Sequence, residues 1–294
     1  MLLINCVGGS KIKSKFAILI VNWNSHVDVG EILNVVPKHI PVVVVDNNSV
    51  ELHKVEAIIE TSTNAVLVRS RVNGGYGAGM NLAIRYVQSE SLAEHVLLLN
   101  PDVYLTEVFL RHVESVCGNF DILGFQQYST NAKGERNYYP CAANFDKGKI
   151  KLIERQSSGS QVVDIVTGAA LLIRVAAFEE VGMFDEGFFH YKEEFDLCFR
   201  MKSAGRTIAI DYEIPLHHKA GSSLAHGSPS AIYYQVRNEI LFAKKHPAIS
   251  SFTSLLNTGA VIRSCVSIST PTKYRTIGTA ILDGLLGKSG IRRL

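Results

Sequence analysis

The sequence predicts an α/β protein whose first hundred residues form a Rossmann-like, nucleotide-binding half. Short β-branched runs such as "FAILIVNW" and "PVVVVDNNS" end in polar turn residues, as buried parallel strands do. Segments with helical spacing of apolar residues separate these runs. The predicted strands cover residues 16–23, 41–49, 65–70 and 95–103, and the predicted helices cover 26–39 and 76–88. This alternation indicates a doubly wound sheet.

The pattern changes from about residue 120. "DILGFQQYSTNAKGERNYYP" indicates a strand and a polar hairpin, and "VDIVTGAALLIRVAAFEEVG" a buried strand with a short helix. A further strand ends in "PLHH", and residues 228–246 have helical spacing with a proline at the start. No low-complexity linker separates the halves, so we expect one continuous domain over residues 1–250, with halves of about 16–118 and 119–250. Residues 251–294 would form a helical extension.

Composition and charge narrow the class of protein. Apolar residues make up 47% and charged residues 19%, and a net charge of +3 is too small to indicate a nucleic-acid partner. The five cysteines are scattered without a C-x-x-C pair, which argues against a disulfide framework or zinc site and favours a reducing compartment. We recognise no cleavable leader and no apolar run of bilayer length. We therefore expect a cytoplasmic protein, either soluble or peripheral at the inner face of the plasma membrane.

Polar residues follow the second and fourth predicted strands. Asp46 ends "VVVVD", where open α/β sheets bind ligands, so it is a candidate for hydrogen bonds to a base or ribose. The alternative is a turn or N-cap aspartate. Asn100 and Asp102 come just after "LLL", although Pro101 makes an ordinary turn an equally simple interpretation. A hard divalent cation on a diphosphate needs only one or two carboxylates, so these strand ends could share one.

A glycine-rich turn follows the third predicted strand in "RVNGGYGAGMN", residues 71–81. Such a turn at a helix start brings backbone N–H groups close to phosphates. The spacing does not fit a dinucleotide fingerprint, because Met80 occupies the third glycine position and the turn does not follow the first strand. A nicotinamide-dependent oxidoreductase is therefore disfavoured. Asn73 and Asn81 add amide side chains at either end, either for a ligand or for capping.

Three carboxylates lie close together in "GFFHYKEEFDLCFRMKSAG", residues 187–205. Acids in a first helical turn complement the helix dipole, and this is one interpretation of the cluster. The other is a shared cation or a general base. If the helix begins near Glu193, Glu194 shares a stripe with the following apolar residues and points toward the interior or a cleft. Glu193 then falls beside Asp196 and Arg200, where charges can pair on the helix surface.

A vicinal histidine pair, His217 and His218, ends the last predicted strand in "PLHHKAGSS". Histidines at a strand end, with a Gly-Ser turn behind them, can ligate a cation or contact a diphosphate. The alternative is that they lie at the surface without a ligand.

Taken in order, these segments resemble the inverting glycosyltransferases of family 2, which have the GT-A fold. They are most similar to the bacterial rhamnosyltransferase-type enzymes of surface polysaccharide synthesis, from about residue 16 to residue 247. "ILIVNWNS" and "VVVVDNNS" match the first two strand signatures, "VNGGYGAGMN" the glycine block and "LLLNPDV" the variant D-x-D segment. "VTGAALLIR" matches the sugar-pocket strand, and "GMFDEGFFHYKEEFDLCFR", "LHHKAGSS" and "YYQVRNEI" match the later blocks. The resemblance implies a mixed central sheet, with the nucleotide-binding half continuous with an acceptor-binding half.

Carried over residue by residue, the resemblance implies a nucleotide-sugar site at the sheet edge. Asp102 would bind Mg²⁺ or Mn²⁺ on the diphosphate, and His217 would lie near the same diphosphate or metal. The donor would be of the dTDP or UDP type, with rhamnose as the family-level expectation for the sugar. The residues implied in donor binding are Asn22, Trp23, Asp46, Asn73, Gly74, Asn81, Asn100 and Gly168.

Glu194 occupies the position of the family's catalytic aspartate. It would deprotonate an acceptor hydroxyl, whose oxygen attacks the anomeric carbon from the face opposite the departing nucleotide. The usual Glu-Asp pair here is Glu193-Glu194, so the base is one methylene longer and Asp196 stays open as the alternative base. Asn100 replaces the first acid of D-x-D, which leaves open how tightly a metal binds without donor. A catalytically weak nucleotide-sugar-binding homologue is therefore the competing interpretation.

The acceptor implied by the resemblance is a glycan or a lipid-linked hydroxyl. The C-terminal "KYRTIGTAILDGLLGKSGIRRL" mixes apolar residues with five basic ones, as expected of a helix that lies on an anionic membrane surface. Packing of this helix on the enzyme's own surface, or against a second copy in a homodimer, is the alternative.

Overall fold

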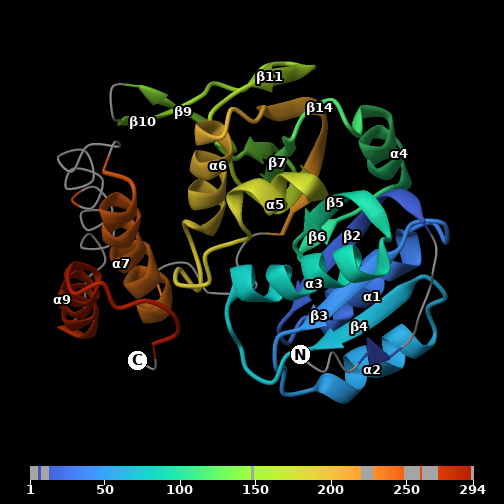
Figure 1. The fold of residues 1–294 in the computed structure, drawn as a ribbon, viewed down its shortest axis with the longest axis horizontal. Helices are drawn as coiled ribbons and strands as arrows, with labels where there is room; N and C mark the ends of the chain where they lie inside the picture. Colours follow the sequence, from blue (N-terminus) through green and yellow to red (C-terminus); the bar gives the residue numbers. More distant parts are fainter. Residues whose placement is uncertain are drawn as a thin grey trace.

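A mixed central sheet runs through the molecule (Figure 1). The computed structural model describes residues 6–7, 13–146, 149–219, 228–247, 259 and 271–292. Within these ranges the strands of the sheet are β1 (Cys6–Val7), β2 (Ser14–Asn22), β3 (Val42–Asp46), β4 (Ala65–Arg69), β5 (Ala93–Leu99), β6 (Val103–Tyr104), β7 (Ile122–Thr130), β8 (Arg136–Tyr138), β11 (Ser160–Val162), β13 (Ala170–Arg174) and β14 (Ile208–His218). Their order is β1-β4-β3-β2-β5-β13-β7-β14-β11, with β6 paired to β14 and β8 to β7.

Strands β2 to β5 are parallel and form the predicted nucleotide-binding half. Alternate residues of β2 divide between two cores, one on each face of the sheet. Helices α1 (His26–Val35), α2 (Leu52–Glu60) and α4 (Glu107–Val116) contribute to one core, and α3 (Tyr76–Glu90), α5 (Val175–Val181) and α6 (Glu193–Ser203) to the other. The doubly wound arrangement is confirmed, although the prediction had not named α2 or α4.

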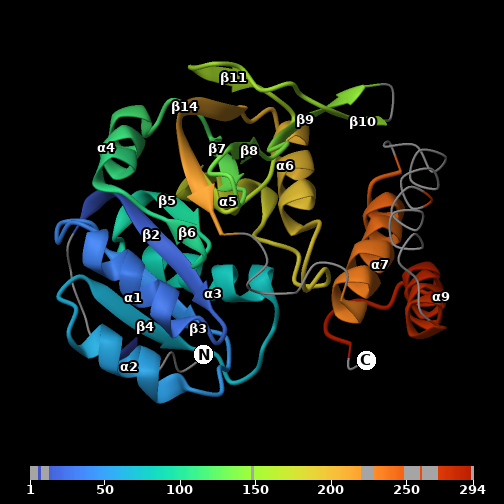
Figure 2. The ribbon, with the colours of Figure 1, turned by 180° about the vertical axis from the view of Figure 1, so that it is seen from behind.

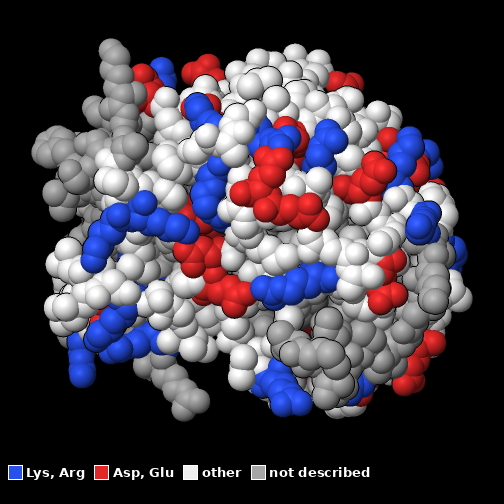
Figure 3. All heavy atoms as spheres, in the orientation of Figure 1, with Lys and Arg blue, Asp and Glu red and all other residues white. Residues whose placement is uncertain are grey.

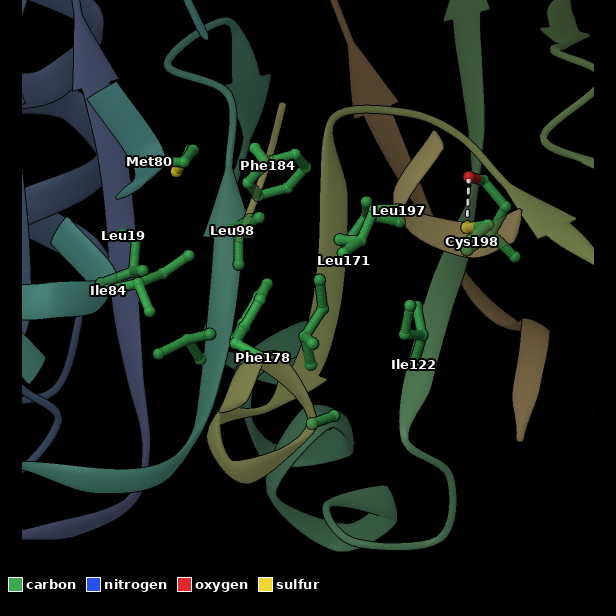
Figure 4. Packing of buried hydrophobic residues seen from close by; sticks show 14 of the residues in the cluster. Leu19, Met80, Ile84, Leu98, Ile122, Leu171, Phe178, Phe184, Leu197 and Cys198 are labelled. Carbon is green, nitrogen blue, oxygen red and sulfur yellow. Dashed lines mark hydrogen bonds between the residues drawn. The ribbon is translucent and has the colours of Figure 1, made fainter. Parts of the chain in front are cut away.

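The two halves of the molecule meet where β13 inserts between β5 and β7. Strand β13 is antiparallel to both neighbours, with Leu171 opposite Leu98 on β5 and Gly124 on β7. Figure 4 shows Leu98, Leu171 and Phe178 packed in one apolar layer. The sheet is therefore mixed, as the resemblance implied, and the two halves share a core.

A smaller sheet and two further helices complete the second half. The smaller sheet has the strands β9 (Ala142–Asp146), β10 (Lys149–Leu152) and β12 (Ile165–Val166), in the order β10-β9-β12. Helices α7 (Pro229–Lys245) and α9 (Pro271–Leu285) lie side by side at one end of the molecule (Figure 2). The predicted helix over 228–246 is thus confirmed. Of the predicted extension, residues 251–258 and 260–270 lie outside the described residues.

Helix α9 packs on α7 through Ile277 and Ala280, which belong to one buried apolar cluster with Tyr233 and Val236. The buried carboxylate of Asp283 accepts a hydrogen bond of 2.9 Å from the Tyr233 hydroxyl. Packing on the protein's own surface is therefore confirmed for one face of this helix. Among the helices in the described part of the chain, none is long and apolar enough to cross a membrane.

Candidate active site

Asn22 and Asp46 lie side by side at the carboxyl ends of β2 and β3. Asn22 Nδ2 donates to Asp46 Oδ1 at 2.8 Å, and the Ser49 N–H donates to Asp46 Oδ2 at 3.0 Å. Asn22 Oδ1 accepts from the backbone N–H of Ser25 at 3.1 Å. Both Asn22 and Asp46 are buried. Asp46 thus stabilises the turn that follows its strand, at the ligand-binding edge of the sheet.

The glycine-rich turn begins α3 against the segment that leads to the acidic cluster. Gly75 has a φ of 88°, and a Cβ there would overlap the carbonyl oxygen of Phe189, so the chain approach requires glycine. The Tyr76 N–H donates to the same oxygen at 3.0 Å. Asn73 Oδ1 accepts from the Gly75 N–H and from Asn47 Nδ2, each at 3.0 Å. Asn73 therefore shapes the turn.

Two other predicted donor residues of this block make internal contacts. The Gly74 N–H donates to Asn47 Oδ1 at 3.3 Å. Asn81 is buried on α3, where Nδ2 donates to the Phe184 carbonyl at 3.0 Å and Oδ1 accepts from the Phe184 N–H at 3.0 Å. Asn81 also donates to Glu186 at 2.9 Å. The structure thus places Asn81 as a link between α3 and residues 184–186, away from the residues that line the first pocket below.

A first pocket of about 120 Å³ opens at this edge of the sheet. It is lined by Val21, Trp23, Ser25, Asn47, Asn73, Gly75, Tyr76, Asn100, Pro101, Phe189 and His190. Trp23 is 41% exposed and lines this pocket, which gives the pocket an accessible aromatic residue. Burial lowers the pKa of His190 to about 4, so its imidazole is neutral at pH 7. Sequence reasoning had not singled out His190, which carries no motif spacing of its own.

Asp102 is buried beyond the end of β5, next to the end of β14. His218 Nε2 lies 3.1 Å from Asp102 Oδ1. The His217 ring instead stacks on Tyr104, with 4.7 Å between centroids, and its Nε2 lies 3.3 Å from Thr130 Oγ1. Neighbouring residues of a strand point to opposite faces, so only one of the two histidines can reach Asp102. The structure brings His218 to this carboxylate, where the prediction had named His217.

The chemistry of Asp102 and His218 suits a hard divalent cation that is held jointly with a ligand. Carboxylate oxygens are preferred by Mg²⁺ and Mn²⁺, and these ions commonly complete their coordination with phosphate oxygens and water. In the described ranges, no group of three or more His, Cys, Asp or Glu side chains is gathered as a metal site. A cation held by Asp102 would therefore need further oxygen ligands from a bound molecule or water.

Gly168 lies just before β13, close to the end of β5. Its φ is 124°, and a Cβ there would overlap the side-chain amide of Gln127. The Asn100 N–H donates to the Ala169 carbonyl at 2.8 Å, which joins the two strand ends. Gln127 is buried and its Nε2 donates to the Thr167 carbonyl at 3.4 Å. The sequence analysis missed Gln127, because a glutamine inside a strand belongs to no motif.

Glu194 lines a second pocket, of about 320 Å³, between the smaller sheet, α6 and α7. Its lining residues are Pro140, Ala142, Ala143, Leu152, Ile165, Thr167, Tyr191, Lys192, Glu194, Phe195, Gln235 and Glu239. Phe189 and His190 line the first pocket, so consecutive parts of one segment face different pockets. Burial raises the pKa of Glu194, and the nearby charge of Lys192 offsets this only in part.

Asp196 and Glu193 are both buried, so the predicted surface position of these carboxylates is wrong, although Asp196 does pair with Arg200 as expected. Asp196 is fully buried and accepts from Arg200 Nε at 2.8 Å, Lys245 Nζ at 2.7 Å and His246 Nε2 at 2.7 Å. Burial alone would raise the pKa of Asp196, but the hydrogen bond from His246 and the charge of Arg200 lower it to about 2. Burial and the adjacent Glu194 raise the pKa of Glu193 well above its ordinary range.

Solved structures define the class to which this architecture belongs. A mannosyltransferase from Pyrobaculum calidifontis, PcManGT, solved with GDP-Man and Mn²⁺, has a TM-score of 0.55 at 10% identity, covering 96% of this chain and 84% of that one. S. aureus TarS 1–349 has a TM-score of 0.54 at 16% identity, with 92% and 81% covered. GalNAc-T7 with UDP, GalNAc and Mn²⁺ has a TM-score of 0.56 at 13% identity, with 92% and 57% covered. The chain has the GT-A fold of glycosyltransferases.

Sequence relatives narrow this class to a family. The low-salt glycan biosynthesis hexosyltransferase Agl10 of Haloferax volcanii is 25% identical over 285 residues, which are 92% of this chain and 90% of that protein. The rhamnosyltransferase WbbL of Escherichia coli K12 is 29% identical over 161 residues, which are 49% of this chain and 59% of that protein. The family described as "Glycosyltransferase like family 2" matches residues 14–227. The chain belongs to this family and is a glycosyltransferase, as the sequence resemblance indicated.

Proposed function

We propose that this enzyme transfers a sugar from a nucleoside diphosphate donor to an acceptor hydroxyl, with inversion at the anomeric carbon and with dependence on Mg²⁺ or Mn²⁺. The observation that carries the proposal is the division of residues 189–194 between two pockets. Phe189 and His190 line the first pocket, and Glu194 opens into the second. A donor in the first pocket and an acceptor in the second would meet across this segment, with a carboxylate on the acceptor side.

The first pocket suits a nucleotide sugar. Trp23 offers an aromatic face to a base, and the buried Asp46 lies at the edge where ribose and base would bind. Neutral His190 can hydrogen-bond a sugar hydroxyl without a charge. Asp102 and His218 would hold the cation, which stabilises negative charge on the departing diphosphate. The UDP and GDP-Man of the two Mn²⁺-containing neighbours support a nucleotide donor, and we propose the dTDP or UDP type.

Glu194 is the proposed general base. Its carboxylate would accept the acceptor's hydroxyl proton while the hydroxyl oxygen bonds to the anomeric carbon. The bond from that carbon to the diphosphate oxygen breaks, and its electron pair leaves with the nucleoside diphosphate. Because burial raises the pKa of Glu194, its carboxylate is a stronger base than an exposed one. Asp196 is less suited, since its carboxylate is fully buried and hydrogen-bonded to three basic side chains.

The second pocket favours an acceptor with apolar surface near its reacting hydroxyl. Alanines of β9, Ile165 of β12 and Phe195 of α6 supply apolar walls. The polar groups include Glu194 and the ion pair between Lys192 and Glu239, whose atoms lie 2.7 Å apart. Sugar rings have apolar faces as well as hydroxyls, so a glycan or lipid-linked sugar matches this lining. The similarity to the rhamnosyltransferase WbbL and the hexosyltransferase Agl10 supports rhamnose or another hexose as the sugar transferred.

Peripheral contact with an anionic membrane would bring the enzyme to a lipid-linked acceptor. Besides the face packed on α7, α9 has exposed leucines at Leu282 and Leu285, and Leu286 is exposed just after the helix ends. Lys273 and Arg275 lie on the same helix, and its acidic residue, Asp283, is buried. In Figure 3, Lys and Arg side chains gather over the region of α7 and α9. Exposed apolar residues with flanking cations are typical of a helix that lies on a membrane surface.

A donor-binding and transfer assay tests the proposed reaction. We expect one nucleotide sugar to raise the melting temperature in the presence of Mn²⁺, because a ligand of the native state stabilises it. Glu194→Gln should keep this shift and lower the transfer rate by about 10²-fold or more. Glu60→Gln, an exposed glutamate on α2, is the matched control and should transfer at the wild-type rate.

The competing function predicts a different pattern. Equal, negligible turnover of wild type and Glu194→Gln, with donor binding intact in both, would identify a nucleotide-sugar-binding homologue without catalysis. Retention of the configuration at the anomeric carbon of the product would overturn the single-displacement reaction. Full donor binding and transfer after chelation of divalent ions would overturn the metal dependence.

A further inference from the structure

Residues 187–192, between the two pockets, contain an unusual run of backbone conformations. Phe189, Tyr191 and Lys192 have φ values of 64°, 69° and 77°. The left-handed conformation costs a non-glycine residue roughly 1–2 kcal/mol, and such residues persist where their surroundings hold them. The segment therefore needs restraint from outside itself.

Asn238 of α7 supplies the first restraint. Its side-chain Nδ2 lies 2.7 Å from the carbonyl oxygen of Phe188, 2.7 Å from that of His190 and 2.9 Å from that of Tyr191, so its two hydrogens are shared among three acceptors. Asn238 is fully buried. Three carbonyl groups within four residues thus converge on one amide nitrogen, which explains how the segment keeps its tight curl.

Arg237 supplies the second restraint and orients the first. Its Nε donates to Asn238 Oδ1 at 2.8 Å, which leaves Nδ2 of that amide directed at the segment. Its Nη2 donates to the carbonyls of Phe188 at 2.8 Å and Gly187 at 3.3 Å. Its Nη1 donates to the Gly290 carbonyl at 2.6 Å, and the Gly290 N–H donates to the Gly187 carbonyl at 2.7 Å. Burying a guanidinium costs free energy unless its N–H groups are hydrogen-bonded. The N–H groups of Arg237 donate to oxygens in or next to the segment 187–192.

The restrained segment connects to both pockets. The Phe189 carbonyl accepts from the Tyr76 N–H at the start of α3, beside the donor pocket. Lys192 pairs with Glu239 and leads directly into Glu193 at the start of α6. A shift of the segment would therefore move a wall of the first pocket and the carboxylate of Glu194 together.

We propose that Arg237 and Asn238 are positioning residues for the transfer reaction, acting through the strained segment 187–192. Neither residue is among the described residues that line the two pockets. Their effect on chemistry is to fix where Glu194 stands relative to the donor. This inference rests on the proposed role of Glu194 as the base.

The test uses Asn238→Ala, the isosteric Asn238→Asp, and Arg237→Lys. Asn238→Asp keeps the volume but replaces the donor by a carboxylate that cannot donate to three carbonyls. Lys244→Ala is the matched control, because Lys244 lies on the same helix and donates to the Leu285 carbonyl at 2.7 Å, away from the segment. Arg237→Lys keeps a buried cation but loses the planar set of N–H donors of the guanidinium. This variant therefore replaces the Asn238 variants in the test if those do not fold.

The first readout is amide hydrogen exchange, which does not depend on activity. We expect the amides of residues 187–192 and of Tyr76 to exchange at least about tenfold faster in the Asn238 and Arg237 variants, with β2 and β3 unchanged. Lys244→Ala should match wild type. Unchanged exchange in the segment, or equal acceleration throughout the central sheet, would overturn the proposal.

The second readout is the pH dependence of turnover. We expect kcat to fall about 10²-fold, as for an ångström-scale displacement of a reacting group. The acidic limb of the kcat profile should move to lower pH, because a loosened segment admits water to Glu194 and lets its raised pKa fall. Wild-type kcat and pH profile in these variants would overturn the proposal. If wild type itself transfers no sugar, the proposed function fails. The exchange experiment still decides whether Arg237 and Asn238 restrain the segment 187–192.

Discussion

Glu194 and Asp196 lie two residues apart on one helix and have opposite environments. Glu194 lines a pocket, and burial raises its pKa. Asp196 is fully buried and hydrogen-bonded to Arg200, Lys245 and His246, which keep its pKa at about 2. A carboxylate that stays ionised under any physiological condition suits a structural anion, and one whose pKa is raised suits proton transfer.

The raised pKa of Glu194 predicts the acidic limb of the activity profile. A base works only when ionised, so kcat should fall as the pH drops through a pKa above the ordinary glutamate value of 4.5. Because Glu193 and Glu194 interact, the apparent pKa belongs to the pair. Glu194→Asp should retain partial activity, lowered by about 10²-fold because the carboxylate is withdrawn by about an ångström. A kcat profile that stays flat below pH 4.5 would contradict this assignment.

Residue identity alone could predict part of this site. Asp46, Asn100, Asp102 and Glu194 were proposed because each ends or follows a strand or lies in the first turn of a helix, and Asn73 because it lies in a glycine-rich turn; their roles stay predictions. The resemblance named His217, whereas His218 lies next to Asp102, and the difference depends on which face of β14 each residue occupies. It also could not place Glu193, because helical phase is least certain in a first turn.

At the scale of elements, α6 is fastened to the end of α7 through Asp196. Lys245 and His246 come from the last turn and C-cap of α7, and Arg200 comes from the next turn of α6. The carbonyls of Val181, Gly182 and Met183 also accept from Arg200, so the loop before α6 joins the same cluster. The helix that carries Glu194 is therefore held at its start and along its side.

Removing the charge of Asp196 should destabilise the protein. Asp196→Asn leaves several buried basic groups without their shared carboxylate, and we expect a loss of about 3–5 kcal/mol in the free energy of unfolding. Its folded pKa of about 2 lies below the ordinary 3.8, so this stabilisation is present above pH 3.8 and is lost as the pH falls toward 2. Denaturant titration of wild type and Asp196→Asn at pH 7 and pH 3 measures both the loss in unfolding free energy and its dependence on pH. Asp28→Asn is the control, because Asp28 pairs with Lys219 at a partly exposed position. It should lower the free energy of unfolding by about 1 kcal/mol or less.

The elements themselves were largely predictable because strands here are β-branched runs with clear ends. The helix α2 was missed because it is only nine residues long and has no side-chain cap, and α4 because it follows a short irregular strand. The antiparallel insertion of β13 between β5 and β7 could not be derived from periodicity, which gives strand positions without partners. The resemblance to a known family supplied the mixed sheet.

At the scale of the whole molecule, α9 has two apolar faces with different surroundings. One is packed on α7 through Ile277 and Ala280. The other presents Leu282 and Leu285 to solvent and is extended by Leu286, the residue that follows the helix. Deleting the helix would uncover α7, so substitutions on the outer face are the sharper probe of membrane contact.

Replacing Leu282, Leu285 and Leu286 by serine should abolish membrane binding without unfolding the enzyme. We expect wild type to float with vesicles of anionic phospholipid and to be released by salt, because apolar insertion and charge attraction both contribute. A matched control replaces Val27 and Val50, exposed apolar residues at the opposite half, by serine. Equal flotation of the triple variant and wild type, or no flotation of wild type, would remove the membrane proposal.

The clamp formed by Arg237, Asn238 and Gly290 has a consequence for the order in which the enzyme matures. Ribosomes deliver a chain from its N-terminus, so residues 187–192 emerge well before the groups that hold them. Strands β7, β13 and β14 contribute to both cores of the parallel half, so that half completes its packing only after those strands have been made. The segment between the pockets must wait longer still, for residues 237–238 and 290. A nascent chain would thus acquire its catalytic geometry last.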